Sequence, residues 1–189
     1  MPVSGRGRRE GVGTGSPAAP ARGSAPARLL AAAAECFYDH GVNGTGIDTI
    51  TAAAGVAKMS LYNNFAGKDD LVLAYLEARH EEWLGLYRRR LAAAGDARQR
   101  VAAVVDAYVD HAEMAHQHGF RGCGLLNAAA ELPAGAPGRQ LVRRHKEEVE
   151  ALLAAHVAEL DGVPAERAAE LAEQLSFLLE GAMARAGLE

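Results

Sequence analysis

The sequence predicts an all-α protein, and three observations support that fold class. Alanine is abundant, runs of β-branched residues are missing and proline is scarce after residue 28, a composition that favours long helices. Apolar residues recur at helical spacing over most of the chain. With 189 residues, 49% of them hydrophobic and 23% charged, the chain can bury a core in one or two compact units.

Residues 1–24 have the composition of a disordered basic tail, rich in Gly, Pro and Ala and without periodic apolar spacing. Residues 1–28 hold five of the 20 basic residues and one of the 24 acidic residues, a charge of +4, which leaves −8 on the other 161 residues. The tail is either an idle extension or an arm whose arginines reach phosphates or the minor groove of DNA. The negative remainder argues against strong sequence-independent binding to nucleic acid.

The first predicted helix covers residues 25–40, where Phe37 belongs to an apolar stripe, and it ends at Gly41. The second begins near Thr45, whose hydroxyl stands where an N-cap is useful. Asp48 follows three residues later and favours the positive end of that helix.

Residues 45–68 read as two short helices joined by a tight turn, followed by the start of another helix. Gly55 supplies the permissive backbone that such a turn needs. Apolar side chains on the core side are Ile47, Ile50, Ala53, Ala54, Val56, Leu61 and Phe65. The side chains left to face outward are Lys58, Ser60, Tyr62 and Asn63. Two short helices over a Gly-bearing turn make a helix-turn-helix, whose second helix fits the DNA major groove.

A fourth helix is predicted from Lys68 to about Ala93, with Asp69 and Asp70 suited to its first turn. It is more than twice as long as the two before it, which indicates a connector between two domains. A further amphipathic run ends near Gly119, and the punctuated segment 120–137 allows one short helix at residues 125–132.

Two long helices close the chain, one broken at residues 161–162 and the other beginning after Pro164. Both are apolar over a broad face. That face is either core of a single domain or shared with a second copy, as a four-helix bundle across a two-fold axis.

Motifs of other protein classes are missing from the sequence. Cys36 and Cys123 match no disulfide framework or zinc spacing, and Cys123 is read as an ordinary thiol with redox sensing as the alternative. The histidines lack the spacing of ligands on one helical face, and no phosphate loop or nucleophile elbow appears. We therefore expect no catalytic residue, no metal and no cofactor. No apolar stretch approaches the roughly 20 residues of a membrane span, and the N-terminus lacks an apolar signal core, so we expect a cytoplasmic protein with no membrane partner.

A fixed frame of residues runs from Arg28 to Leu76. In order, the frame holds Phe37, Gly41, Thr45, Ile50, Ala54, Gly55, Val56, Leu61, Tyr62, Phe65 and Lys68. This pattern resembles the N-terminal domain of the TetR family of transcriptional regulators. The C-terminal half, with GCGLLNAAAELP and VRRHKEEVEALL, resembles one regulatory-domain subgroup of that family more weakly.

The resemblance implies a homodimeric repressor that binds a palindromic operator in double-stranded DNA and is released by a small-molecule effector of unknown identity. It places a three-helix DNA-binding domain at residues 25–72 and a helical regulatory and dimerisation domain at residues 73–189. The alternative is a helix-turn-helix regulator without ligand control, acting as an activator or an architectural binder.

The resemblance also assigns site residues. On phosphates it places Thr45, Tyr62 and Lys68, and on the groove-facing side of the third helix Lys58, Met59, Ser60 and Asn63. The chemistry agrees, because Lys58 and Ser60 can donate to guanine or phosphate, Met59 can touch a thymine methyl and Asn63 can pair with adenine. Thr45 could instead be only a cap, and Tyr62 a partly buried ring. Gly46 and Asn64 stand where a hydroxyl residue and a histidine, respectively, are frequent in the family.

Candidates for the ligand pocket are aromatic and polar residues of the C-terminal half. They are Trp83, Tyr87, Tyr108, Met114, Phe120, Asn127 and Phe177. Plain core packing is the alternative for each of them.

Overall fold

The computed structural model describes residues 23–114 and 119–188. Within these ranges it holds eight helices and no strand, which confirms the predicted all-α class. The helices are α1 (Ala25–His40), α2 (Ile47–Ala54), α3 (Lys58–Tyr62), α4 (Lys68–Ala92), α5 (Ala97–Glu113), α6 (Gly124–Glu131), α7 (Pro137–Val157) and α8 (Ala165–Ala186). Of the predicted tail, residues 1–22 lie outside the described part. None of the described helices is both long and apolar enough to cross a membrane.

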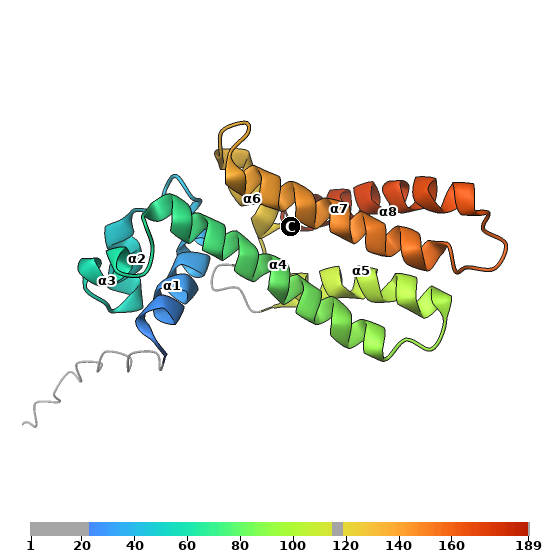
Figure 1. Cartoon of the computed structure of the whole chain (residues 1–189), viewed down its shortest axis with the longest axis horizontal. Coiled ribbons are helices and arrows are strands. Elements are labelled where there is room, and N and C mark those ends of the chain that lie inside the picture. The colour runs from blue at the N-terminus through green and yellow to red at the C-terminus, as the bar shows by residue number, and fades with distance from the viewer. Residues whose placement is uncertain (1–22, 115–118, 189) are drawn as a thin grey trace, which may run out of the picture.

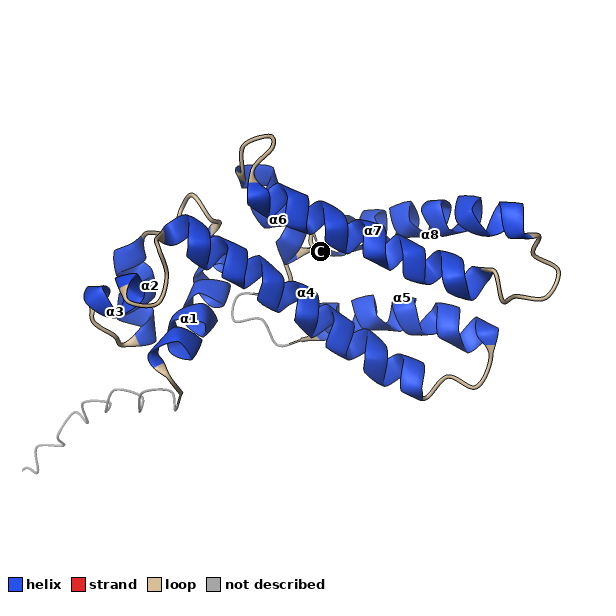
Figure 2. Cartoon of the chain, in the orientation of Figure 1, coloured by secondary structure: helices blue, strands red, loops and turns tan. Residues whose placement is uncertain are grey.

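The helices form two groups that α4 connects (Figures 1 and 2). α1, α2 and α3 gather at one end of the molecule, and α4 runs from them into the second group (Figure 1). There α4 packs on α5 and α7, and α7 packs along α8. α6 contacts α1, α4 and α7, so it bridges the two groups. The predicted architecture, an N-terminal helix-turn-helix unit followed by a helical domain, is confirmed.

The first core cluster joins the N-terminal helices to the start of α4. Phe37 and Ile50 are buried in it, and the Phe37 ring meets Tyr75 of α4 edge-on with centroids 5.5 Å apart. Leu125 of α6 and Leu141 of α7 belong to the same cluster. The packing is therefore continuous across residues 72 and 73, where the sequence places the domain boundary and where α4 runs without a break.

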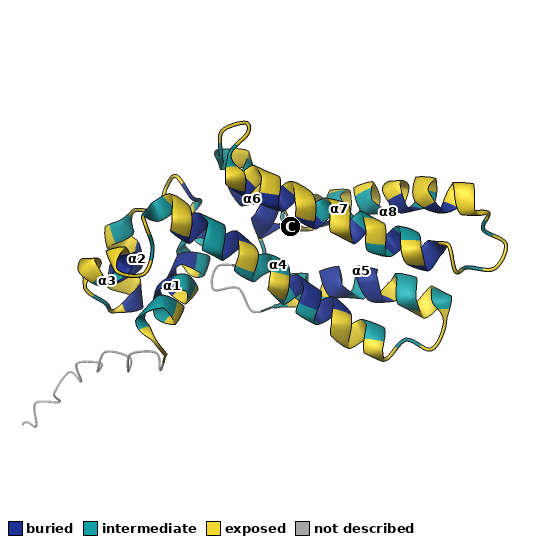
Figure 3. Cartoon of the chain, in the orientation of Figure 1, coloured by how far each residue is buried: buried dark blue, intermediate teal, exposed yellow. Residues whose placement is uncertain are grey.

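The second core cluster fills the space between α4, α5, α7 and α8. Trp83 lies at its centre, stacked on Tyr87 with ring centroids 5.7 Å apart and meeting the edges of Tyr108 and His145. Figure 3 shows the buried faces of α4 and α5 turned toward each other and the exposed faces turned to solvent. This cluster makes the C-terminal group a packed bundle.

Most helix limits agree with the predicted ones, and three differ. α2 begins at Ile47 with Gly46 at the N-cap and no side-chain cap bond, so the predicted cap by Thr45 is wrong. α5 ends at Glu113, several residues before Gly119. α7 ends at Val157, ahead of the predicted break, because the following residues close tight i to i+3 turns that replace the helical ladder.

Candidate functional site

The turn between α2 and α3 is fixed by a glycine and an arginine. Gly55 ends α2 in the left-handed region at φ 61°. Arg28 of α1 donates from Nη2 to the carbonyl oxygens of Ala54 at 2.5 Å and Gly55 at 2.8 Å. A Cβ atom at position 55 would lie 2.7 Å from that nitrogen, so only glycine fits both the backbone and the contact. Arg28 thus neutralises the carbonyl end of α2, a role that the sequence did not reveal.

One edge of α3 is left open to solvent. Leu61 is fully buried and anchors the helix, while the side chains of Met59 and Tyr62 are 67% and 48% exposed. Lys58 and Asn63 are also exposed. We call Lys58, Met59, Tyr62 and Asn63 the α3 edge. It has the orientation that the sequence predicts, and its contact with DNA stays a prediction.

The basic group of the α3 edge is held in place by an acid. The Lys58 ammonium lies 2.8 Å from the Asp48 carboxylate of α2. That hydrogen bond raises the pKa of Lys58, so the side chain stays cationic. Ser60 is half-buried, and its carbonyl oxygen accepts a hydrogen bond from Nδ2 of Asn64 at 2.7 Å, which fastens the end of α3.

Thr45 does not reach the surface of this site. Its side chain is 2% exposed, and its hydroxyl lies 2.7 Å from the carbonyl oxygen of Gly41 and 3.0 Å from that of Cys36. A buried hydroxyl that donates to backbone carbonyls has no free proton for a phosphate, so the structure disagrees with the predicted contact. Lys68 begins α4 and is half-buried, and its contact with a phosphate stays a prediction.

α6 holds the loop after α1 through a carboxylate. Oε1 and Oε2 of Glu131 accept hydrogen bonds from the backbone N–H groups of Val42 at 3.1 Å and Asn43 at 2.7 Å. The Asn43 side chain donates back to the Glu131 carbonyl oxygen at 3.3 Å. We call this arrangement the Glu131 latch. It connects the last residue of α6 to the segment that leads into α2.

A second set of contacts holds the C-terminal end of α1. The Tyr38 hydroxyl donates to the carbonyl oxygen of Gly122 at 3.2 Å and accepts from the backbone N–H of Arg121 at 2.6 Å. The Arg121 guanidinium donates to the carbonyl oxygen of Tyr38 at 2.9 Å and also to that of Asp39. The segment before α6 therefore holds the end of α1, and the last residue of α6 holds the loop that follows α1.

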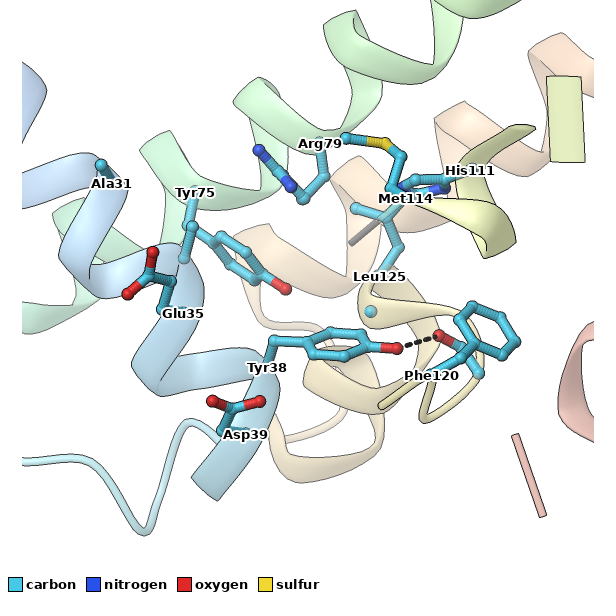
Figure 4. A pocket seen from close by; sticks show the side chains of 13 residues that line it. Ala31, Glu35, Tyr38, Asp39, Tyr75, Arg79, His111, Met114, Phe120 and Leu125 are labelled. Atoms are coloured by element: carbon cyan, nitrogen blue, oxygen red, sulfur yellow. Dashed lines mark hydrogen bonds between the residues drawn. The ribbon is translucent and has the colours of Figure 1, made fainter. Parts of the chain in front are cut away.

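Next to the Tyr38 contacts lies a cavity of about 580 Å³, which we call the junction pocket (Figure 4). Its walls come from α1, α4, the end of α5 and the start of α6. It is lined by Ala31, Ala34, Glu35, Tyr38, Asp39, Tyr75, Arg79, His111, Met114, Phe120, Gly122, Gly124 and Leu125. Another hollow, of about 660 Å³, lies at the far end of the bundle between residues 96–101 and 159–163. Of these two cavities, the junction pocket is the one with walls from both groups of helices.

The predicted ligand residues divide into three sets. Met114 and Phe120 line the junction pocket. Trp83, Tyr87 and Tyr108 are buried in the second core cluster, where packing against one another accounts for them. The remaining two face solvent, since Asn127 is exposed and donates to the Arg121 carbonyl oxygen, and Phe177 is 68% exposed on α8. These last five residues do not line the junction pocket, and their part in ligand binding stays a prediction.

Known proteins share both the sequence and the fold of this chain. Residues 29–75 match the sequence model of the bacterial regulatory proteins of the tetR family. A TetR-family transcriptional regulator from Streptomyces coelicolor is 36% identical, with 87% of this chain and 85% of that chain covered and a TM-score of 0.78. The chain belongs to the TetR family.

Other relatives of this TetR-family regulator are named for their functions. It is 39% identical over 94 residues to the transcriptional activator FasR of Mycolicibacterium smegmatis, covering 50% of this chain and 42% of FasR. It is 31% identical over 88 residues to the transcriptional repressor KstR2 of Rhodococcus jostii, covering 47% of this chain and 43% of that protein. The matches span less than half the length of these curated relatives. The chain is a transcriptional regulator, and its relatives include both an activator and a repressor.

The histidines of this TetR-family regulator form pairs rather than a metal centre. His80 and His145 place their Nδ1 atoms 2.9 Å apart, and His111 lies 3.6 Å from Glu82. Burial, with Lys146 nearby, lowers the pKa of His145 to about 3, so that ring is neutral. Among residues 23–114 and 119–188, no group of three or more His, Cys, Asp or Glu side chains is placed to hold a metal ion.

Neither cysteine forms a disulfide. Cys36 is half-buried and Cys123 is buried. The Lys146 ammonium lies 3.5 Å from the Cys123 sulfur, and its stronger contact is the Glu180 carboxylate at 2.7 Å. Sequence spacing could not show this lysine, because it comes from a different helix. The choice between an ordinary and a redox-sensing thiol at Cys123 stays open.

Proposed function

We propose that this TetR-family regulator is a homodimeric repressor that binds a palindromic operator in double-stranded DNA and is released by a small-molecule ligand. The observation that carries the DNA-binding part is the α3 edge. Met59 is 67% exposed although it is apolar, while Leu61 two residues later is fully buried. Exposed apolar groups beside a cation on a short second helix match what base edges in a major groove require.

Each side chain of this surface has a proposed role. Lys58 and Ser60 donate to guanine acceptors or phosphates, Met59 contacts a thymine methyl and Asn63 pairs with adenine. Tyr62 and Lys68 contact phosphates and fix the register of the helix on the duplex. Asp48 has to release Lys58 when DNA binds, since the same ammonium cannot serve both partners fully. We leave Thr45 out of the contact set because its hydroxyl is buried.

The proposed dimer uses α7 and α8. These helices pack along each other, and α8 exposes Phe177 and Leu178, which are 68% and 69% accessible. Gly181 and Ala182 follow one turn later and are also exposed, so a second copy can approach closely. Contiguous exposed apolar groups on one helix are typical of an interface, and two α7–α8 pairs across a two-fold axis complete a four-helix bundle.

Ligand control is proposed to act through the position of α4. A dimer reads two half-sites only when its recognition helices are about 34–36 Å apart, the spacing of successive major grooves. A ligand that shifts α4 or α1 changes that spacing. A coupling of about 1–3 kcal/mol weakens operator affinity roughly 5–150-fold. Because coupling is reciprocal, an effector that binds equally well with and without operator contradicts ligand control.

The test is selection of bound sequences from a random DNA pool by the full chain. We expect a palindromic consensus whose half-sites lie one helical turn apart. Met59→Ala should relax the preference at one thymine in each half-site, whereas Val109→Ala, which truncates an exposed apolar residue on α5, should leave the consensus unchanged. A consensus without two-fold symmetry, or one that Met59→Ala does not alter, refutes the proposal.

An activator is the second candidate, favoured by the similarity to FasR, which is a transcriptional activator. A transcription assay with purified components, on a promoter that carries the selected operator, distinguishes a repressor from an activator. Transcription that falls when the protein is added supports a repressor, and transcription that rises supports an activator.

A further inference from the structure

The junction pocket has walls from both groups of helices. α1 contributes Tyr38 and Glu35, α4 contributes Tyr75 and Arg79, and the segment 120–125 closes the opposite side (Figure 4). At about 580 Å³ it lies in the size range of small-molecule sites, about 300–1,000 Å³. A molecule in this pocket therefore contacts the DNA-binding helices directly.

Two hydrogen-bond donors in the pocket lack partners. The Tyr75 hydroxyl is buried and has no hydrogen-bond partner. The Nε–H group of Arg79 is also buried and donates to no acceptor. The two residues are one turn apart on α4, and Figure 4 shows both side chains extending from that helix toward the pocket. Burial raises the pKa of Tyr75 well above its usual value, so the hydroxyl keeps its proton. Buried unpartnered donors are rare in folded proteins, and a ligand acceptor would satisfy them.

The floor of the pocket is shaped by a glycine. A Cβ atom at position 124 would stand 2.9 Å from the Tyr75 oxygen and 3.1 Å from the Tyr38 ring. Gly124 is the first residue of α6 and has an ordinary backbone conformation, so its small size, not its flexibility, matters there. The space that it leaves lies next to the unpartnered hydroxyl.

Most of the remaining surface is apolar. Met114, Phe120 and Leu125 face the pocket from one side and the Tyr38 ring from the other (Figure 4). These groups suit a flat or bulky hydrocarbon body. The polar part of the ligand therefore lies at the α4 wall.

The charges of the pocket disfavour an anion. Arg79 already pairs with the Glu82 carboxylate at 2.8 Å, so its positive charge is compensated. Glu35 and Asp39 add two carboxylates on the α1 wall, and His111 is paired with Glu82 at 3.6 Å. A ligand carboxylate would meet more negative than positive charge and would lose its hydration as well.

We propose that the junction pocket binds a neutral, mostly apolar molecule with one oxygen acceptor, such as a ketone or an ester, whose oxygen accepts hydrogen bonds from Tyr75 and Arg79. This assignment rests on the proposed ligand control and names the class of the effector. A bound molecule of this kind would contact α1 at Tyr38, one of the two points at which the C-terminal helices hold α1 and the loop after it.

The test uses three probes of the same shape that differ in one group: 2-acetylnaphthalene, 2-naphthoate and 2-ethylnaphthalene. Calorimetric titration of the full chain without DNA gives each dissociation constant. The ketone should bind roughly 10-fold or more tightly than the carboxylate, and more tightly than the hydrocarbon, since only the ketone satisfies the donors without adding charge.

Variants connect the affinity to the residues. Tyr75→Phe should weaken the ketone roughly 3–10-fold and leave the hydrocarbon unchanged, because it removes only the hydroxyl. Tyr87→Phe removes a hydroxyl that is bonded to His156 outside the pocket, and it should change neither affinity. Gly124→Ala should weaken both probes by filling the floor, with circular dichroism to show that the helices remain.

Three results would overturn the proposal: no saturable binding of any probe, naphthoate binding as tightly as the ketone, or a ketone affinity that Tyr75→Phe does not change. Operator binding, measured with the same probes, keeps the two proposals apart. If the ketone binds as expected but does not alter operator affinity, ligand control fails and the ligand class stands. If another molecule releases the operator and Tyr75→Phe does not affect it, the ligand class fails and ligand control stands.

Discussion

The Glu131 latch offers a direct measure of how firmly the regulatory helices hold the DNA-binding helices. In the native protein both carboxylate oxygens of Glu131 accept a hydrogen bond from a backbone N–H. Glu131→Gln keeps one acceptor oxygen and replaces the other with an NH2 group, which cannot accept from the second N–H. A hydrogen bond to a charged group contributes about 1.5–3 kcal/mol when buried, and this pair is half-exposed. We therefore expect the free energy of unfolding to fall by about 1–2 kcal/mol, a decrease of roughly 2–8 °C in Tm for a chain of this size.

Urea unfolding at one fixed protein concentration measures the loss, because dimerisation makes the apparent stability depend on concentration. Glu77→Gln is the matched control, an exposed glutamate on α4. Amide hydrogen exchange adds a local readout, since the N–H groups of Val42 and Asn43 should exchange faster in Glu131→Gln alone. The reasoning is refuted if the two variants unfold within about 0.3 kcal/mol of each other, or if exchange at residues 42 and 43 does not change.

Three further predictions concern DNA contact, pH and assembly. Lys58→Gln should weaken operator binding and reduce the slope of log affinity against log salt by about 0.9, and an unchanged slope in binding assays at several salt concentrations would mean that Lys58 contacts no phosphate. The pKa of His145 is lowered from 6.5 to about 3, so the unfolded chain binds a proton there that the native chain does not. Stability should fall as pH drops below 6.5, by up to about 1.4 kcal/mol per pH unit, and His145→Gln should flatten that slope in urea titrations; equal slopes would contradict the burial argument. Phe177→Glu should yield monomers in sedimentation experiments, and a persistent dimer would place the interface elsewhere.

The sequence predicted the N-terminal helices well because local signals there agree with one another. Gly41 and Gly55 end α1 and α2, and both have positive φ. Leu61 and Met59 lie two residues apart and face opposite ways, as a helical period requires of them. The local prediction is wrong at two positions. Ala53, expected on the core side, is exposed. The Thr45 hydroxyl bonds back to a preceding carbonyl oxygen instead of capping α2, as a hydroxyl near a helix start can do.

The pocket could not be predicted in the same way. The aromatic character of Trp83 and Tyr108 makes them pocket candidates in the sequence, but helical spacing cannot tell whether an inward face meets a cavity or another side chain. Five of the thirteen lining residues come from α1, among them Ala31 and Tyr38, which the sequence assigns to the DNA-binding domain. Contacts between segments more than 80 residues apart, such as Tyr38 with Gly122, leave no trace in a local pattern.

The Tyr38 contacts and the Glu131 latch limit how freely the domains of this protein can be exchanged with those of its relatives. Fusing the DNA-binding domain of a relative to α4 would place a different loop against Glu131 and a different side chain against Gly122. A hybrid needs a hydroxyl at position 38 and N–H groups at positions 42 and 43 that can reach Glu131. Without them, its DNA-binding helices would be held less firmly against the C-terminal helices. Engineers who wish to redirect the regulator should therefore exchange only the solvent-facing residues of α3, or transplant α1 and α6 as a matched set.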